Sequence, residues 1–268
     1  MRTSHYIKIA CLVLVVGFMF LDAKAEEGVG KIQKWKLIWS EEFDQKNGKL
    51  DATKWTPCER AKSDWSNYMS KREDLYELKN GYLRLTGVVN KDQSKDKVPF
   101  LTAGVTSKGK FDFKYGKIEI RAKFKSAQGA WPALWMLGAE KSWPKNGEID
   151  LMEHLNYQDQ VYQTVHSSYT VSKGGKGKPQ SSVKAKIDRE KFNTYGAEWD
   201  KDKVVFLVNG KVTMTYPRLS DKGEQQFPFD QPFYIILSMQ IEGDWVGKAD
   251  PKQYPAWMDV DWVRVWQK

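Results

Sequence analysis

Short stretches in which apolar and charged residues alternate constrain this chain more than any other feature. In residues 117–124, KIEIRAKF, every second residue is apolar and each residue between them is charged. A period of two is typical of a β-strand that is buried on one face. Half-buried strands are typical of antiparallel sheets, so the stretch predicts an antiparallel sheet with one solvated face.

A second signal is the pair Asn209-Gly210, which separates the strand-like residues 204–208 and 211–216. Asn-Gly is favoured at the two central positions of a tight hairpin turn, because both need a positive φ. Further strands are predicted over 82–86, 161–169, 233–239 and 258–266, and we find no amphipathic helix longer than two turns. The chain is therefore predicted to be all-β, a single-domain antiparallel β-sandwich of two sheets.

The first 25 residues have the pattern of a targeting segment. Basic residues precede an apolar run at 9–21, and Ala23-Lys24-Ala25 resembles a signal-peptidase site. We expect residues 1–25 to be a signal peptide and 26–268 to be the folded domain, exported to the periplasm or outside the cell. The run is too short to span a bilayer comfortably, and no other stretch approaches eighteen apolar residues, so no membrane span is predicted.

The charge and the cysteine content limit which partners and which stabilising bonds are expected. The formal net charge is +9, and removing the three basic and one acidic residues of 1–25 leaves +7. Basic residues are scattered among acidic ones, which favours a solvated surface over a nucleic-acid partner. Residues 173–178, KGGKGK, predict a loop, and Cys58 alone remains beyond residue 25, so no internal disulfide is expected. We expect a monomer.

The stretch GEIDLMEH at 147–154 carries the candidate chemistry. On a regular strand Glu148 and Asp150 share a face and Glu153 points the other way. A one-residue bulge at Leu151-Met152 would return Glu153 to the shared face, and bulges are frequent beside active sites.

Three carboxylates on one face suit retaining glycoside hydrolysis. One carboxylate attacks the anomeric carbon, and a second, roughly 5 to 5.5 Å away, protonates the leaving oxygen. A third between them can share their charge and raise a neighbour's pKa. The alternatives are a solvated edge strand and a calcium site. The apolar run at 130–137 argues against the first, and the missing Asp/Asn/Gly alternation argues against the second.

The sequence resembles glycoside hydrolase family 16 in its bulged form, with two residues between Asp150 and the second Glu. The resemblance rests on GEIDLMEH and continues, in the family's order, through WSEEFD at 39–44, YGKIEIRAK at 115–123, GAWPALWML at 129–137 and VDWVRV at 260–265. It implies a jelly-roll sandwich with a concave substrate cleft. It also implies that Glu148 is the nucleophile, Asp150 its assisting carboxylate and Glu153 the general acid/base.

Aromatic and histidine side chains are the next candidates for substrate contacts. Indole faces stack on sugar rings, and Trp131 and Trp245 match cleft positions of the family, whereas Trp135 is as readily explained as a core residue. His166 lies on a predicted strand beside the catalytic one, where it could bond Glu153 or substrate. A zinc site would need a third ligand and a known spacing, which the sequence lacks.

The resemblance also implies a structural calcium, as many family members have one on the convex side. The matching positions are Glu42, the Gly81 carbonyl and Asp261. Such an ion is optional, and no cofactor is expected for catalysis.

The substrate is expected to be a polysaccharide or a glycoprotein glycan. Family β-1,3-glucanases usually have His-Trp where this chain has His166-Ser167, and Asn where it has Ser238. Residues 63–70 and 238–247 look more like endo-β-galactosidases that cut poly-N-acetyllactosamine in mucin-type O-glycans. Candidate contacts to galactose are Asn67, Arg72 and Gln240.

Three other functions stay open. The first is an endo-β-1,3-glucanase or mixed-linkage β-glucanase. A glycan-binding module is disfavoured because all three carboxylates are present. A transglycosylase is disfavoured because such relatives usually have the unbulged motif.

Overall fold

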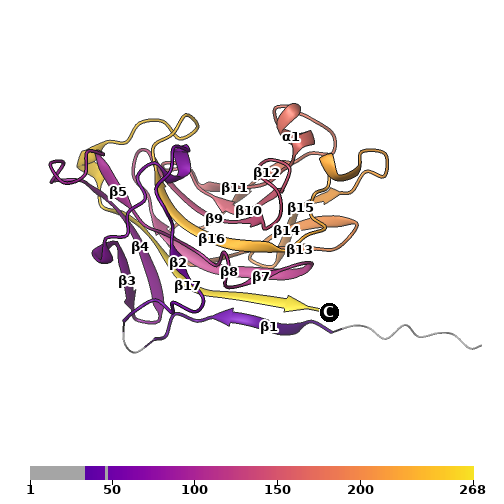
Figure 1. Ribbon diagram of the computed structural model, residues 1–268, viewed down its shortest axis with the longest axis horizontal. Helices are drawn as coiled ribbons and strands as arrows, with labels where there is room; N and C mark the ends of the chain where they lie inside the picture. The colour runs from indigo at the N-terminus through magenta and orange to yellow at the C-terminus, as the bar shows by residue number, and fades with distance from the viewer. Residues whose placement is uncertain (1–33, 46–47) are drawn as a thin grey trace, which may run out of the picture. The chain divides into compact units, whose positions relative to one another are not determined.

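Two antiparallel sheets form the protein. The computed structural model describes residues 34–45 and 48–268, so the predicted signal peptide lies outside the described residues. Figure 1 shows the two sheets as stacked layers, and the apolar side chains between them come from both. The predicted two-sheet antiparallel sandwich is therefore confirmed.

The described part of the chain holds nine strands in the first sheet, in the order β15-β14-β13-β8-β17-β4-β3, with β1 paired to β17 and β5 to β4. Their bounds are β1 Lys36–Glu41, β3 Tyr76–Lys79, β4 Tyr82–Val89, β5 Phe100–Thr102, β8 Gly116–Lys125, β13 Asn193–Trp199, β14 Lys203–Val208, β15 Lys211–Pro217 and β17 Ala256–Gln267.

Eight described strands form the second sheet, in the order β12-β11-β10-β9-β16-β6-β2, with β7 paired to β16. Its outer face is concave, and α1 rises beside it (Figure 1). The bounds are β2 Thr56–Pro57, β6 Gly104–Thr106, β7 Asp112–Phe113, β9 Ala130–Gly138, β10 Glu148–Glu153, β11 Gln160–His166, β12 Ser182–Lys186 and β16 Phe233–Ile241.

Helical structure is scarce across the described ranges. There is one α-helix, α1 (Ser168–Ser172), and there are four 3-10 turns: η1 Asp64–Ser66, η2 Glu73–Leu75, η3 Gly223–Gln225 and η4 Pro251–Gln253. None of these helices is long and apolar enough to cross a membrane.

The predicted alternation is present in β8. Its residues alternate between buried and half-buried along nearly the whole strand, and Ile118, Ile120 and Ala122 lie in the core between the sheets. Burying one such aliphatic side chain contributes about 1.5 to 3 kcal/mol, so this pattern fixes which face of the strand turns inward. The predicted hairpin joins β14 to β15, and both Asn209 (φ 51°) and Gly210 (φ 73°) have the positive φ that the turn requires.

One strand prediction is wrong at its end. Residues 161–169 were expected to be extended, but β11 ends at His166 and α1 begins at Ser168. Ser167 caps the helix, since its Oγ accepts a bond from the Thr170 N–H and the Thr170 Oγ1 accepts one from the Ser167 N–H. This reciprocal capping satisfies two backbone donors and turns the chain away from the sheet.

Candidate active site

The strand β10 carries the predicted bulge. Asp150 pairs with Thr164 and Glu153 with Tyr162 on β11, so three steps along β10 correspond to two along its neighbour. One extra residue is therefore present between the two acids. Glu148, Asp150 and Glu153 consequently project from the same, concave face.

The residues inside the bulge explain why it forms there. Leu151 and Met152 are both fully buried in the core between the sheets. A regular strand would expose one of two consecutive side chains, so the extra residue lets both stay buried. At the start of β10, Gly147 has φ +73°, and a Cβ there would lie 2.8 Å from the Pro228 side chain. Glycine is therefore required directly before Glu148.

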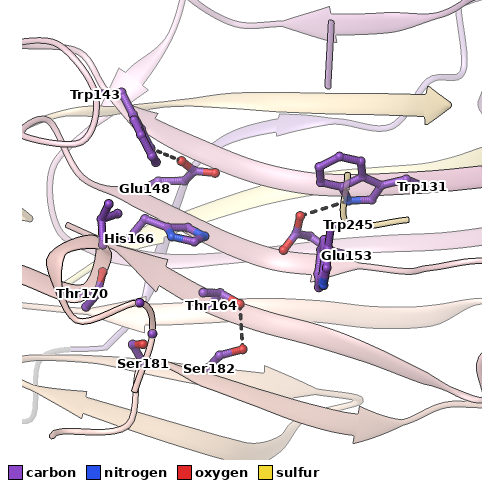
Figure 2. A pocket seen from close by; sticks show the side chains of 13 residues that line it. Trp131, Trp143, Glu148, Glu153, Thr164, His166, Thr170, Ser181, Ser182 and Trp245 are labelled. Atoms are coloured by element: carbon purple, nitrogen blue, oxygen red, sulfur yellow. Dashed lines mark hydrogen bonds between the residues drawn. The ribbon is translucent and has the colours of Figure 1, made fainter. Parts of the chain in front are cut away.

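Glu148 is held by an indole. Trp143, on the loop between β9 and β10, donates a hydrogen bond from Nε1 to Glu148 Oε2 at 2.6 Å (Figure 2). The buried side chains of Asn146 and Gln231 pin this loop, with Asn146 Nδ2 donating to the Gly138 carbonyl and Gln231 Nε2 to the Asn146 carbonyl. Trp143 was missed in the sequence. Its position in a loop five residues before Glu148 was the available signal.

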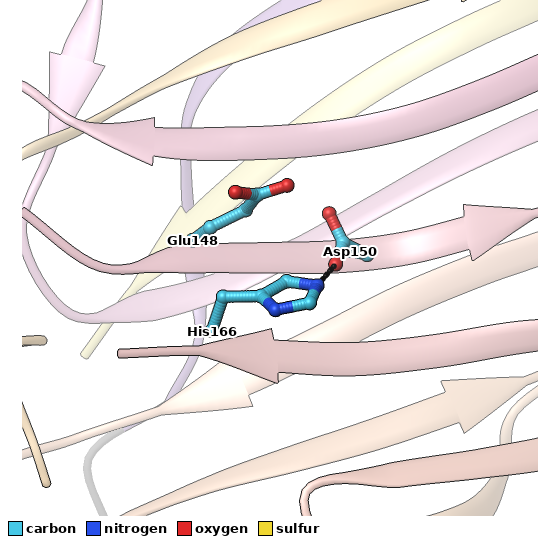
Figure 3. A group of neighbouring side chains, drawn as sticks. All are labelled: Glu148, Asp150 and His166. Atoms are coloured by element: carbon cyan, nitrogen blue, oxygen red, sulfur yellow. Dashed lines mark ion pairs between the residues drawn. The ribbon is translucent and has the colours of Figure 1, made fainter. Parts of the chain in front are cut away.

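Asp150 is buried between its neighbours. Burial raises the pKa of this carboxyl well above its usual range, and the negative charge of Glu148 and a hydrogen bond with Glu148 add to the shift. His166 Nε2 lies 3.3 Å from Asp150 Oδ2 (Figure 3), within ion-pair distance although the two atoms do not form an aligned hydrogen bond. The structure thus places His166 beside Asp150, and the expected bond of His166 to Glu153 or to substrate stays a prediction.

Glu153 is buried at the other end of the strand. Burial raises the pKa of its carboxyl well above the usual range, and the charges of Asp150 and Glu148 raise it further. The Trp131 indole donates a hydrogen bond from Nε1 to Glu153 Oε1 at 3.0 Å, which partly opposes the shift. The net shift favours the protonated form of the Glu153 carboxyl.

Two carboxylates and an imidazole could in principle hold a cation. One ligand atom each from Glu148, Asp150 and His166 lie within 4.8 Å of one another. Burial and the neighbouring Glu148, however, raise the pKa of Asp150 and favour its neutral form, which is a poor metal ligand. The arrangement suits a proton-sharing carboxyl pair.

A pocket of about 520 Å³ lies over these groups. Trp131 and Trp245 meet edge to face at 5.5 Å between ring centroids, and Tyr162 meets Trp245 at 4.9 Å, so aromatic rings border the Glu153 end. The other wall comes from α1 and the loop that follows it. The lining residues are Trp131, Trp143, Glu148, Glu153, Thr164, His166, Thr170, Val171, Gly174, Gly175, Ser181, Ser182 and Trp245.

Trp135 does not line this pocket. It points to the concave face but is only 4% exposed, because Trp65 covers it edge to face at 5.0 Å. Its Nε1 donates to Ser238 Oγ at 3.1 Å. Gln240 is also buried, and its Nε2 donates to the same Ser238 Oγ at 2.9 Å. Both side chains build the floor of the concave face beside Trp131.

The other two candidate galactose contacts also lie outside the pocket lining. Arg72 is exposed and forms a two-bond pair with Asp74, at 2.6 and 2.8 Å. Asn67 directly follows η1 and is half-buried. Neither side chain lines the pocket at the carboxylates, although Trp65 of the same connection between β2 and β3 packs on Trp135.

The expected calcium ligands are engaged with arginines. Arg264 donates two hydrogen bonds to the Glu42 carboxylate, at 3.0 and 2.8 Å, and Asp261 pairs with Arg121. Gly81 lies in the turn between β3 and β4. Calcium takes six to eight oxygen ligands, and a guanidinium beside each carboxylate opposes a second cation. In this arrangement both carboxylates pair with arginines, and the calcium stays a prediction.

Fold and carboxylate arrangement together are those of a jelly-roll glycoside hydrolase. The chain belongs to glycosyl hydrolases family 16, whose model matches residues 40–264. The resemblance found in the sequence is thus confirmed.

Individual relatives differ in what they act on. The chain is 38% identical over 238 residues to the keratan-sulfate endo-1,4-β-galactosidase of Sphingobacterium multivorum, across 87% of this chain and 55% of that protein. It therefore spans about half the length of that relative. It is 32% identical over 278 residues to a β-glucanase of Rhodothermus marinus, across 96% and 92%.

A solved structure is similar too. It comes from work on endo-acting O-glycanases that prominent members of the human gut microbiota express to initiate mucin breakdown. The TM-score is 0.75 at 30% identity, and the match covers 86% of this chain and 98% of the other.

Proposed function

We propose that this domain is an endo-acting, retaining β-glycoside hydrolase that cleaves internal β-1,4-galactosidic bonds in poly-N-acetyllactosamine, as in mucin-type O-glycans. The observation that carries the proposal is the bulge of β10, which gives Glu148, Asp150 and Glu153 one common face. Glu148 is the nucleophile, Asp150 its assisting carboxyl and Glu153 the general acid/base.

In the first step a Glu148 oxygen attacks the anomeric carbon and the glycosidic C–O bond breaks. The proton of Glu153 moves to the leaving oxygen, for which its raised pKa is suited. The Trp143 N–H and the Asp150 carboxyl both bond Glu148, so they hold the nucleophile in position.

In the second step water attacks the same carbon. Glu153, now a carboxylate, takes a proton from the water, and the bond between Glu148 and the sugar breaks. Two displacements on one carbon restore its configuration, so the product keeps the β-anomeric form. No metal or organic cofactor is needed for either step.

Galactose specificity is supported by the keratan-sulfate relative and by two departures from the glucanase pattern. The first departure is Ser167, which caps α1 at one wall of the pocket. The second is Ser238, which accepts hydrogen bonds from Trp135 and Gln240. Trp131 and Trp245 offer indole faces to sugar rings. Asn67, Arg72 and Gln240 stay candidates for contacts farther along the chain of sugars.

A second candidate is an endo-β-1,3-glucanase or mixed-linkage β-glucanase. It is supported by the identity to the β-glucanase of Rhodothermus marinus, which extends over nearly the whole of both proteins. The two candidates share the mechanism and differ in the sugar bound and in the linkage cleaved.

We further propose that residues 1–25 are a signal peptide and that 26–268 acts as a monomeric domain in the periplasm or outside the cell. The N-terminal sequence of the exported protein and its sedimentation would test both statements.

Product analysis tests the substrate. The purified domain is incubated with poly-N-acetyllactosamine, keratan, mucin glycans, laminarin and mixed-linkage glucan, with Glu148→Gln as the inactive control. We expect short oligosaccharides from the lactosamine chains and nearly none from the glucans. Efficient cleavage of laminarin alone would replace the galactosidase with the second candidate.

A further inference from the structure

The wall of the pocket opposite Trp131 carries basic residues and no acidic ones. Residues 160–187 contain five lysines and no aspartate or glutamate, although the whole chain has 34 acidic residues against 43 basic ones. This segment comprises β11, α1, the following loop and β12. Its lysines are 173, 176, 178, 184 and 186.

The loop lysines lie at the pocket rim. Gly174 and Gly175 line the pocket, and Lys173 and Lys176 flank them directly in the chain. Lys178 is held nearby, because the Tyr169 hydroxyl of α1 donates a hydrogen bond to its carbonyl at 3.0 Å. All three lysine side chains are exposed.

The other two lysines belong to the concave face itself. Lys184 pairs with Tyr162 and Lys186 with Gln160, and directly opposed residues of an antiparallel pair point to the same side. Ala185 between them and Val183 before them pack on the core, which agrees with this assignment. Lys184 also lies over the Tyr162 ring, 5.2 Å from its centroid, and Tyr162 contacts Trp245.

These ammonium groups have no carboxylate partner among the described residues. Some lysines elsewhere on the surface do, as in the ion pairs of Lys141 with Glu224, Lys201 with Asp202 and Lys222 with Asp221. What sets the segment apart is that its five lysines lie together without an acidic residue among them. Five unpaired cations beside one cleft create a local positive potential that attracts anions. Burial raises the pKa values of Asp150 and Glu153 in the floor, which weakens the negative charge that they set against this potential.

We propose that the segment from Lys173 to Lys186 is a subsite for anionic substituents of the glycan, namely sulfate esters or sialic-acid carboxylates on the lactosamine chain. The inference rests on the proposed function and adds the charge of its substrate. Lysine suits the role, since a mobile point charge can meet an anion at variable positions along a chain.

The test compares sulfated with neutral chains. We would measure kcat/KM on keratan sulfate, on the same material after desulfation, and on sialylated and neutral poly-N-acetyllactosamine, at low and high salt. The variant combines Lys173→Gln, Lys176→Gln and Lys178→Gln. The control combines Lys36→Gln, Lys203→Gln and Lys211→Gln, which removes the same charge from exposed positions of the other sheet.

The wild type should prefer the anionic chains, and the loop variant should lose about five- to ten-fold of that preference, as three exposed charge pairs allow. The control should keep it. High salt should also reduce it, because the screening length falls from about 30 Å at 0.01 M to about 3 Å at 1 M. The sulfated and sialylated arms identify which anion is bound.

Equal use of charged and neutral lactosamine chains by the wild type would overturn the subsite and leave the proposed function standing. If no lactosamine chain is cut, the proposed function fails. The subsite is then tested separately, by measuring how Glu148→Gln binds immobilised keratan sulfate and its desulfated form. A lysine-dependent preference in binding would support it, and equal binding would reject it.

Discussion

The two ends of β10 present the same functional group in different surroundings. At one end Glu148 lies half-buried at the pocket and takes a short hydrogen bond from the exposed indole of Trp143. At the other end Glu153 is 9% exposed and takes a longer bond from the half-buried indole of Trp131. Each carboxyl thus has an indole donor, but only Glu153 is buried.

This difference separates the roles of two chemically equal groups. Burial and the two neighbouring carboxyl groups raise the pKa of Glu153, which suits its proposed role as the general acid. The Glu148 end is open to the pocket and is bonded by two donors, which suits a carboxylate that attacks. Asp150 lies between them, and the charge of Glu148 and a hydrogen bond with Glu148 contribute to its raised pKa.

The largest expected effect distinguishes the two ends directly. Glu148→Gln should reduce turnover by several orders of magnitude on every substrate, because no other group can form the covalent intermediate. Glu153→Gln should be equally inactive on natural glycans but recover on an aryl glycoside whose leaving group needs no proton. Steady-state kinetics on both substrates checks this, and equal recovery of both variants would contradict the separate roles.

Asp150→Asn should lower turnover less than either change, since Asp150 only supports its neighbours, and should stabilise the fold at neutral pH. The raised pKa of Asp150 means that its contribution to stability is complete below its usual value near 3.8 and is lost as pH rises through the folded value. Asparagine cannot ionise, so this loss disappears. Each kcal/mol gained raises the Tm by about 2 to 4 °C.

Calorimetry at pH 4 and pH 7 measures this effect. The gain of Asp150→Asn over the wild type should grow with pH. A variant that loses stability equally at both values would indicate that the carboxylate form is favoured in the fold.

Trp143→Phe removes one N–H donor from Glu148 and keeps an aromatic ring. Hydrogen bonds to charged groups are worth about 1.5 to 3 kcal/mol, so kcat should fall roughly ten- to a hundred-fold. Unchanged kcat would remove Trp143 from the positioning of the nucleophile. Circular dichroism and the Tm control for folding.

Trp131→Phe should act mainly on the pH profile. The Trp131 N–H stabilises the charged form of Glu153, so its loss raises the pKa of that carboxyl further. The acid must be protonated for the first step, and the alkaline limb of kcat/KM should therefore move to higher pH. In Trp143→Phe this limb should stay in place.

The smallest effect on activity is expected at Trp135. Its indole is covered by Trp65 and bonds Ser238, so Trp135→Phe should cost about 1 kcal/mol of stability and leave KM nearly unchanged. Trp245→Ala, at a half-exposed ring of the pocket, should instead raise KM. A large rise in KM for Trp135→Phe would return Trp135 to the substrate contacts.

The sequence was sufficient where local rules decide the structure. Alternation predicted β8, Asn209-Gly210 predicted the β14–β15 hairpin, and the spacing of the three acids predicted the bulge. In each case the signal lies within ten residues and follows from the two-residue period of a strand.

It was insufficient where distant segments decide the contact. Trp143 reaches Glu148 because Asn146 and Gln231 fix its loop, and Gln231 lies 85 positions from Asn146 in the chain. Trp135 is covered by Trp65 from the connection between β2 and β3. The end of β11 was missed because its capping box uses Thr170 where Glu or Gln is usual.

The stereochemistry of the product tests the central claim most directly. If Glu148 attacks and Glu153 protonates from one face of β10, the reaction proceeds through two displacements. Proton NMR during the first minutes of hydrolysis, before the anomers equilibrate, should show the new reducing end in the β form. An initial α-anomer would mean a single displacement by water and would contradict the paired roles of Glu148 and Glu153.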